Sequence, residues 1–183
     1  MQLTNSPTRY GAIPQALHWL TVICVVAGWL LGQFIDDIPK GPARAFGLWT
    51  HVTLGELVLL FLLLRLVWRL ANPPPPFEPT RFGRLAEIAS GVSHFALYAL
   101  LVAVPFVGII VQLKRGNALP IFGLWDFASP WPTDRAAAGS ILEVHELLAN
   151  ALLVLAAIHA GAALIHHYAL GDRTLSRMLP GRT

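Results

Sequence analysis

Five histidines lie inside long apolar stretches of this 183-residue chain. Ionisable side chains are costly inside a membrane and usually mark a functional site there. Imidazole is also a common ligand of transition metals. If several of these rings lie at matching depths, they predict a metal-containing redox cofactor inside a helical bundle. The five residues are His18, His51, His94, His145 and His159.

The spacing of His145 and His159 predicts two sites rather than one. Along a helix, the rotation from one residue to the other is about 40° short of four full turns, so both side chains lie on nearly the same face. Their separation along the helix axis is about 21 Å. One metal ion cannot reach both rings, but two sites stacked along a bundle can.

The composition indicates a membrane protein. Hydrophobic residues make up 55% of the chain and charged residues only 13%, against about 25% charged residues in soluble domains. The net charge of +3 could indicate a nucleic-acid partner. The basic residues, however, flank the apolar runs, so membrane topology explains them better and no nucleic-acid binding is expected.

Four apolar runs are long enough to cross a bilayer, which takes about 20 residues. We therefore predict a single domain over residues 1–183, an all-α integral membrane four-helix bundle. Asn72 and the four prolines after it should break the chain between the second and third runs. The aromatic-rich segment Lys114–Gly139 is expected to form an ordered loop at the membrane interface. The predicted helices are Ala16–Ile35, Leu48–Leu70, Ile88–Leu113 and Ile141–Leu170.

The distribution of Lys and Arg predicts that both termini are cytoplasmic. In that orientation the inner side holds eight basic residues and the outer side five. The inner set is Arg9, Arg65, Arg69, Arg81, Arg84, Arg173, Arg177 and Arg182, and the outer set is Lys40, Arg44, Lys114, Arg115 and Arg135.

Threading the four helices through the bilayer pairs the histidines by depth. His18 and His159 fall near the inner face, and His51 and His145 near the outer face. Each pair joins two different helices, as bis-imidazole ligation of haem in a bundle requires. His94 also begins its helix near the inner face and is an alternative inner ligand.

Haem fits these pairs better than zinc, because zinc takes four protein ligands and no neighbouring Cys, Asp or Glu completes either pair. Cys24 is the single cysteine, so the C-x-x-C-H attachment of a c-type haem is excluded. We therefore predict two non-covalent haems b, with Arg65 and Arg69 beside the inner propionates. Glycines could admit a flat macrocycle or only serve helix packing; they are Gly28, Gly32, Gly55, Gly108 and Gly161.

Ordered motifs along nearly the whole chain resemble the prokaryotic cytochrome b561 family, and within it the superoxide oxidase type. The motifs begin with Leu17-His18-Trp19-Leu20 and Thr50-His51-Val52-Thr53-Leu54-Gly55. Arg65-Leu66-Val67-Trp68-Arg69, Ser93-His94 with Pro105, and Arg115-Gly116-Asn117 follow. The last two are His145-Glu146-Leu147-Leu148-Ala149 and the stretch from His159 to Tyr168.

The resemblance implies a multi-pass cytochrome of the bacterial inner membrane that exchanges electrons with ubiquinone. Superoxide oxidase members take electrons from periplasmic superoxide, and other members link quinone to a partner dehydrogenase or hydrogenase. The sequence leaves both activities open. For superoxide, Lys114 and Arg115 would steer the anion to the outer haem, unless they only anchor their helix. Quinone is expected near the inner haem, at His166 and its neighbours His94 and Trp19, although His166 could instead hold a propionate.

Overall fold

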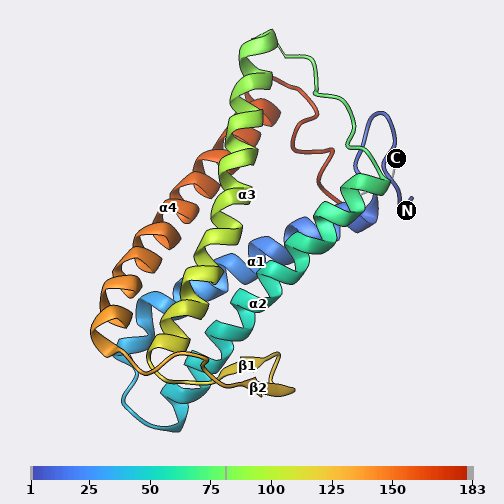
Figure 1. Cartoon of the computed structure of the whole chain (residues 1–183). Helices are drawn as coiled ribbons and strands as arrows, with labels where there is room; N and C mark the ends of the chain where they lie inside the picture. The colour runs from blue at the N-terminus through green and yellow to red at the C-terminus, as the bar shows by residue number, and fades with distance from the viewer. Residues whose placement is uncertain (1, 81, 181–183) are drawn as a thin grey trace.

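The computed structural model describes residues 2–80 and 82–180, and four long helices make up most of it (Figure 1). The prediction of an all-α four-helix protein is confirmed. A small two-stranded hairpin lies in the loop between the last two helices. The helices are α1 (Ala12–Phe34), α2 (Pro42–Ala71), α3 (Gly83–Lys114) and α4 (Arg135–Tyr168), with the 3-10 turn η1 (Ile35–Asp37) and the strands β1 (Leu119–Ile121) and β2 (Trp125–Phe127).

Each helix begins several residues before the apolar run that predicted it. Apolar runs mark the hydrocarbon layer, whereas helices continue into the polar interface until a local signal ends them. The Asp134 side chain accepts a hydrogen bond from the Ala137 amide and thereby starts α4 before the predicted Ile141. Pro42 occupies the first turn of α2, a position that needs no amide donor.

Among the described residues, three helices are long and apolar enough to cross a membrane. They are α1 together with η1, α3 and α4. The structure thus supports three of the four predicted spans by length and composition. The remaining helix, α2, is 30 residues long. It carries Glu56, Arg65 and Arg69.

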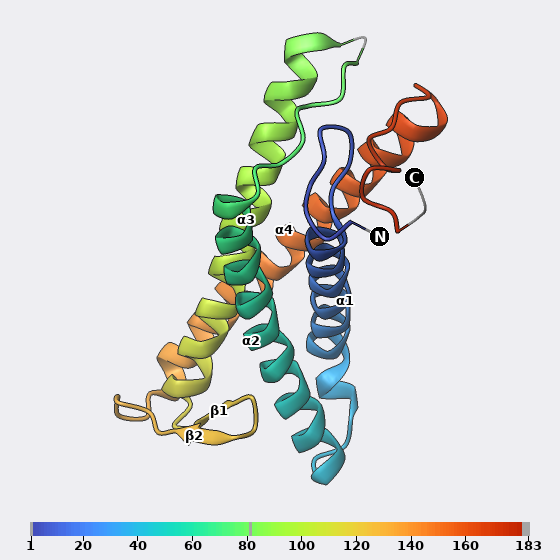
Figure 2. The ribbon, with the colours of Figure 1, turned by 90° about the vertical axis from the view of Figure 1, so that its right-hand side faces the viewer.

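The helices pack as two pairs, α1 with α2 and α3 with α4 (Figure 2). The pairs meet around a central apolar cluster. Every helix contributes to this cluster. Because Leu152 lies midway between His145 and His159 in the sequence, the cluster separates the two levels of histidines. Its buried members are Cys24, Val58, Leu62, Leu101 and Leu152.

The hairpin caps one end of the bundle, which we call the hairpin end. The Phe122 amide donates a 2.8 Å hydrogen bond to the Glu56 carboxylate on α2, and Gly123 lies against the Trp49 ring. Glu56 is buried. The predicted interfacial loop is therefore tied to α2 in one defined position.

The opposite end, which we call the termini end, holds the first and last described residues of the chain and the proline connector (Figure 1). Asn72 and the prolines after it are not helical, as predicted. The buried Arg177 side chain donates hydrogen bonds to the carbonyls of Thr8 and Pro76 and forms an ion pair with Glu78. Three segments far apart in sequence thus form one cap. Arg81 and Arg182 lie outside the described residues, and the cytoplasmic placement of this end stays a prediction.

Candidate functional site

His51 and His145 meet at the hairpin end of the bundle. Their ring centroids are 6.1 Å apart and their planes are inclined by 75°. His51 comes from α2 and His145 from α4, so the pair joins the two helix pairs. The structure thus brings together the two residues that depth matching assigned to the outer site.

Backbone carbonyls fix the protonation pattern of both rings. His51 Nδ1 lies 2.8 Å from the Gly28 carbonyl oxygen on α1, and His145 Nδ1 lies 3.0 Å from the Val104 carbonyl oxygen on α3. A carbonyl can only accept, so each Nδ1 carries the proton and donates it. The Nε2 lone pair of each ring is therefore available to a metal, as in metal sites where a carbonyl orients the ligating imidazole.

The separation of these rings also suits one metal between them. An imidazole nitrogen binds a first-row metal at about 2 Å, so two imidazoles on opposite sides of one ion hold their ring centres roughly 6 Å apart. The observed distance of 6.1 Å agrees with this geometry. His51 and His145 therefore fit the two axial positions of a haem.

Three histidines gather at the second level, toward the termini end. The rings of His94 and His159 are 5.2 Å apart with planes inclined by 66°. His18 is close enough to interact electrostatically with both rings. The structure thus keeps His94 beside the predicted pair of His18 and His159. The separation of His94 from His159 is shorter than the roughly 6 Å expected for two rings on opposite sides of one metal.

Arg65 and Arg69 lie beside this second group, on α2. Arg65 is within electrostatic reach of His18 and His159, and both arginines are within reach of His94. The Arg65 guanidinium lies 5.4 Å from the centre of the Tyr98 ring. Two cations next to an imidazole cluster suit the propionates of a haem, and the assignment of Arg65 and Arg69 to them stays a prediction.

His166 and Trp19 both have protein partners. His166 Nδ1 lies 2.5 Å from Asp172 Oδ2, and the second Asp172 oxygen accepts the Thr174 amide at 2.9 Å. Burial alone would raise the pKa of Asp172, but the hydrogen bonds from His166 and Thr174 outweigh it and lower the pKa below its ordinary value of 3.8. The Trp19 indole donates to the Met178 carbonyl at 2.9 Å, so that donor is already used.

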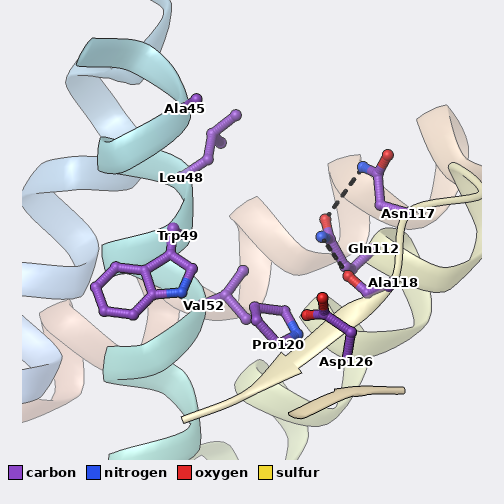
Figure 3. A pocket seen from close by; sticks show the side chains of 9 residues that line it. All are labelled: Ala45, Leu48, Trp49, Val52, Gln112, Asn117, Ala118, Pro120 and Asp126. Atoms are coloured by element: carbon purple, nitrogen blue, oxygen red, sulfur yellow. Dashed lines mark hydrogen bonds between the residues drawn. The ribbon is translucent and has the colours of Figure 1, made fainter. Parts of the chain in front are cut away.

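Two surface hollows lie at the hairpin end, and they differ in charge. A hollow of about 340 Å³ is lined by Arg115, Asn117, Arg135 and Gly139. The other, of about 330 Å³, lies between α2, the end of α3 and the hairpin, and carries the Asp126 carboxylate (Figure 3). An anion would favour the first hollow.

The two residues predicted to steer an anion occupy different surroundings. Arg115 lines the cationic hollow. Lys114 lies over the Trp131 ring, with its ammonium 5.4 Å from the ring centre. Arg135, which the sequence indicated only as one of the basic residues on the outer side, lies beside Arg115 in the hollow.

Residues 9–181 match the family model for prokaryotic cytochrome b561. This chain belongs to the prokaryotic cytochrome b561 family. It is 32% identical to cytochrome b561 homolog 2 of Escherichia coli strain K12, over 98% of this chain and 95% of that protein. It is 31% identical to the probable superoxide oxidase CybB of Yersinia pestis, over 94% of this chain and 96% of that protein. The similarity to cytochrome b562 of Cereibacter sphaeroides is 29% identity over 98% of this chain and all of that protein.

Membership of the family makes the chain a membrane cytochrome of the haem b type. When bound, haem b supplies a one-electron redox centre held by axial protein ligands.

The sequence indicates the histidines as candidate ligands but does not indicate the groups that orient their rings. The carbonyls of Gly28 and Val104 are backbone atoms that no motif reveals. Asp172 follows the end of α4, where the apolar pattern gives no signal.

Proposed function

We propose that this cytochrome b561 family member holds two haems b and transfers electrons from superoxide to ubiquinone across the bacterial inner membrane. The observation that carries the proposal is the pair of imidazoles, His51 and His145, whose spacing suits one iron and whose Nε2 atoms are free to bind it. His18 and His159 are the proposed ligands of the second haem. The probable superoxide oxidase among its relatives supports the choice of substrate.

In this proposal α2 also spans the membrane and both termini lie in the cytoplasm. α2 packs along α1, a span candidate, and also contacts α3. The described ends of the chain lie together at one end of the bundle. The excess of basic residues at that end favours the cytoplasmic side. The hairpin end would then face the periplasm, with His51 and His145 nearer to it.

Superoxide would react at the hairpin end. Each superoxide gives up one electron and leaves as dioxygen, so two superoxide ions supply the two electrons that convert one ubiquinone to ubiquinol, with two protons taken up. If His51 and His145 both bind the haem iron, no position on the iron would remain for superoxide, and the protein would need only to bring the anion near. Arg115 and Arg135 line a hollow at this end without a carboxylate among its lining residues. Their field would concentrate superoxide there.

Rapid mixing of the purified holoprotein with superoxide and a soluble quinone tests this proposal. We expect fast ubiquinol formation, with a rate that falls as salt screens the field over about 8–10 Å. An Arg115→Ala/Arg135→Ala variant should react roughly tenfold more slowly at low ionic strength and lose most of the salt dependence. Lys40→Ala/Arg84→Ala removes the same charge away from the hollow and is the control.

A superoxide rate that ignores salt in the unaltered protein would contradict the steering role of the two arginines. Absence of any superoxide-dependent ubiquinol formation would contradict the superoxide activity itself. If gentle extraction then recovered a dehydrogenase or hydrogenase with the cytochrome, the protein would be an electron-transfer subunit of that enzyme.

Ubiquinone would bind toward the termini end, near His166. A quinone ring needs an apolar slot with one or two polar groups at its carbonyls, and its reduction takes up protons. The Asp172 carboxylate lies 2.5 Å from His166 Nδ1 and holds the imidazole in one orientation. An imidazole held in this way can relay a proton to the quinone oxygen. Trp19 is the weaker of the predicted quinone contacts, because its indole N–H already binds the Met178 carbonyl.

Asp172→Asn should slow quinone reduction by roughly 10- to 100-fold while both haem spectra stay unchanged. The lowered pKa of Asp172 keeps this group a carboxylate at neutral pH. The carboxylate stops supporting His166 only as the pH falls through that lowered pKa. Asp37→Asn, at the other end of the bundle, is the control. An unaltered rate of quinone reduction would remove His166 and Asp172 from the quinone site.

A further inference from the structure

Two glycines lie against the imidazoles of His51 and His145. A Cβ added at Gly32 would lie 3.2 Å from His51 Cε1, and one added at Gly108 would lie 2.9 Å from His145 Cε1. Both distances are shorter than ordinary contacts of a Cβ atom. Each imidazole therefore occupies space that any other residue at these positions would fill.

The two contacts repeat one local arrangement on different helices. In α1, the His51 ring bonds the carbonyl of Gly28 and packs on Gly32, one turn later. In α3, the His145 ring bonds the carbonyl of Val104 and packs on Gly108, again one turn later. The amide four residues after a carbonyl is its regular helical donor. A glycine there leaves the side of that carbonyl open to a second donor, the imidazole.

No such contact is present at the second level of histidines. At none of the described glycines do the atoms nearest to an added Cβ belong to His18, His94 or His159. Gly161, two residues after His159, faces open space. The arrangement is therefore specific to the rings at the hairpin end and is not a general consequence of small residues in packed helices.

We infer that Gly32 and Gly108 are positioning residues that fix the orientation of the His51 and His145 imidazoles and, through it, the electronic properties of the haem between them. The inference rests on the proposed ligation by these two histidines. Each ring is fixed by two contacts, a backbone hydrogen bond at Nδ1 and a glycine surface beside Cε1. Together these contacts hold the planes at 75°.

Alanine at either glycine displaces the ring and weakens its bond to the carbonyl. That bond makes the imidazole a stronger donor to the metal, so weakening it raises the reduction potential of the haem. A change in the angle between the two planes also moves the low-spin EPR signal, because near-perpendicular axial imidazoles give a more anisotropic signal than parallel ones. Gly108 has the larger effect, because its contact is the closer of the two.

The test is Gly108→Ala in the purified holoprotein, followed by redox titration and EPR. We expect one of the two haems to show a raised potential and a shifted low-spin signal, while the other is unaltered. Gly32→Ala should change the same haem by a smaller amount. Gly91→Ala, on the same helix as Gly108, is the matched control, because a Cβ there meets nothing within 4 Å, and it should leave the two haems unchanged.

Two outcomes separate this inference from the ligation that it rests on. If His145→Ala loses a haem but Gly108→Ala and Gly32→Ala leave potentials and EPR signals unchanged, the glycines have no positioning role. If His145→Ala keeps both haems, the proposed ligation itself is wrong. Thermal unfolding gives an independent readout, since the three atoms nearest to a Cβ added at Gly108 all belong to the His145 ring. Gly108→Ala should destabilise the protein with His145 present and not in a His145→Ala background, and equal destabilisation in both backgrounds would overturn the inference.

Discussion

His145→Ala should remove one of the two haems and leave the other with its low-spin spectrum. The reason is that a low-spin b haem needs both axial imidazoles, and alanine offers no ligand at this position. Removing either partner of the His51 and His145 pair should therefore halve the haem content of the purified protein. The pyridine haemochrome assay and reduced-minus-oxidised spectra measure this directly.

The loss should come from ligation and not from damage to the fold. Alanine is the best helix former, so α4 keeps its backbone. The Val104 carbonyl loses its bond from His145 Nδ1 but keeps the regular helical donor four residues later. His167→Ala is the control, because it removes an imidazole from the same helix that lies in neither pair. Two haems with unchanged low-spin spectra in His145→Ala or His51→Ala would show that the ligands at the hairpin end are other residues.

The helices and the depths of the histidines could be predicted from sequence because both depend on local pattern. Apolar runs of bilayer length predict helices, and the rise of a helix converts the interval from His145 to His159 into distance. The boundaries were less accurate. Pro42 and Asp134 start their helices through backbone geometry and capping, which do not depend on hydropathy.

Contacts between segments far apart in sequence could not be predicted. Glu56 places a charge inside an apolar run. The sequence around it does not show that its carboxylate accepts a hydrogen bond from the Phe122 amide. The sequence identifies Gly32 and Gly108 only as small residues near the histidines. Their contact with the imidazole rings depends on the rotation of each helix against its neighbour. The partner of His166 likewise lies beyond the helix end, at Asp172.

The grouping of His18, His94 and His159 shows why depth matching left the second pair open. All three residues fall at one level, and depth along the membrane normal does not distinguish between residues at the same level. Side-chain geometry distinguishes His94 from His18 as a partner for His159. The rings of His94 and His159 are 5.2 Å apart, which is too close for opposite sides of one iron, and His94 Nδ1 lies 3.3 Å from Ser90 Oγ on its own helix.

His159→Ala and His18→Ala should each remove the haem nearer the termini end, whereas His94→Ala should retain both haems. Loss of either axial imidazole leaves the iron with one protein ligand, so the effect should match that of His145→Ala but on the other haem. The two haems can be distinguished because the Gly108→Ala shift in potential marks only the haem at the hairpin end. Combining Gly108→Ala with His159→Ala should leave a single haem, and that haem should carry the shift. If His94→Ala instead removes a haem and His18→Ala keeps both, then His94 is the ligand. The ring separation of 5.2 Å would then have to widen when haem binds.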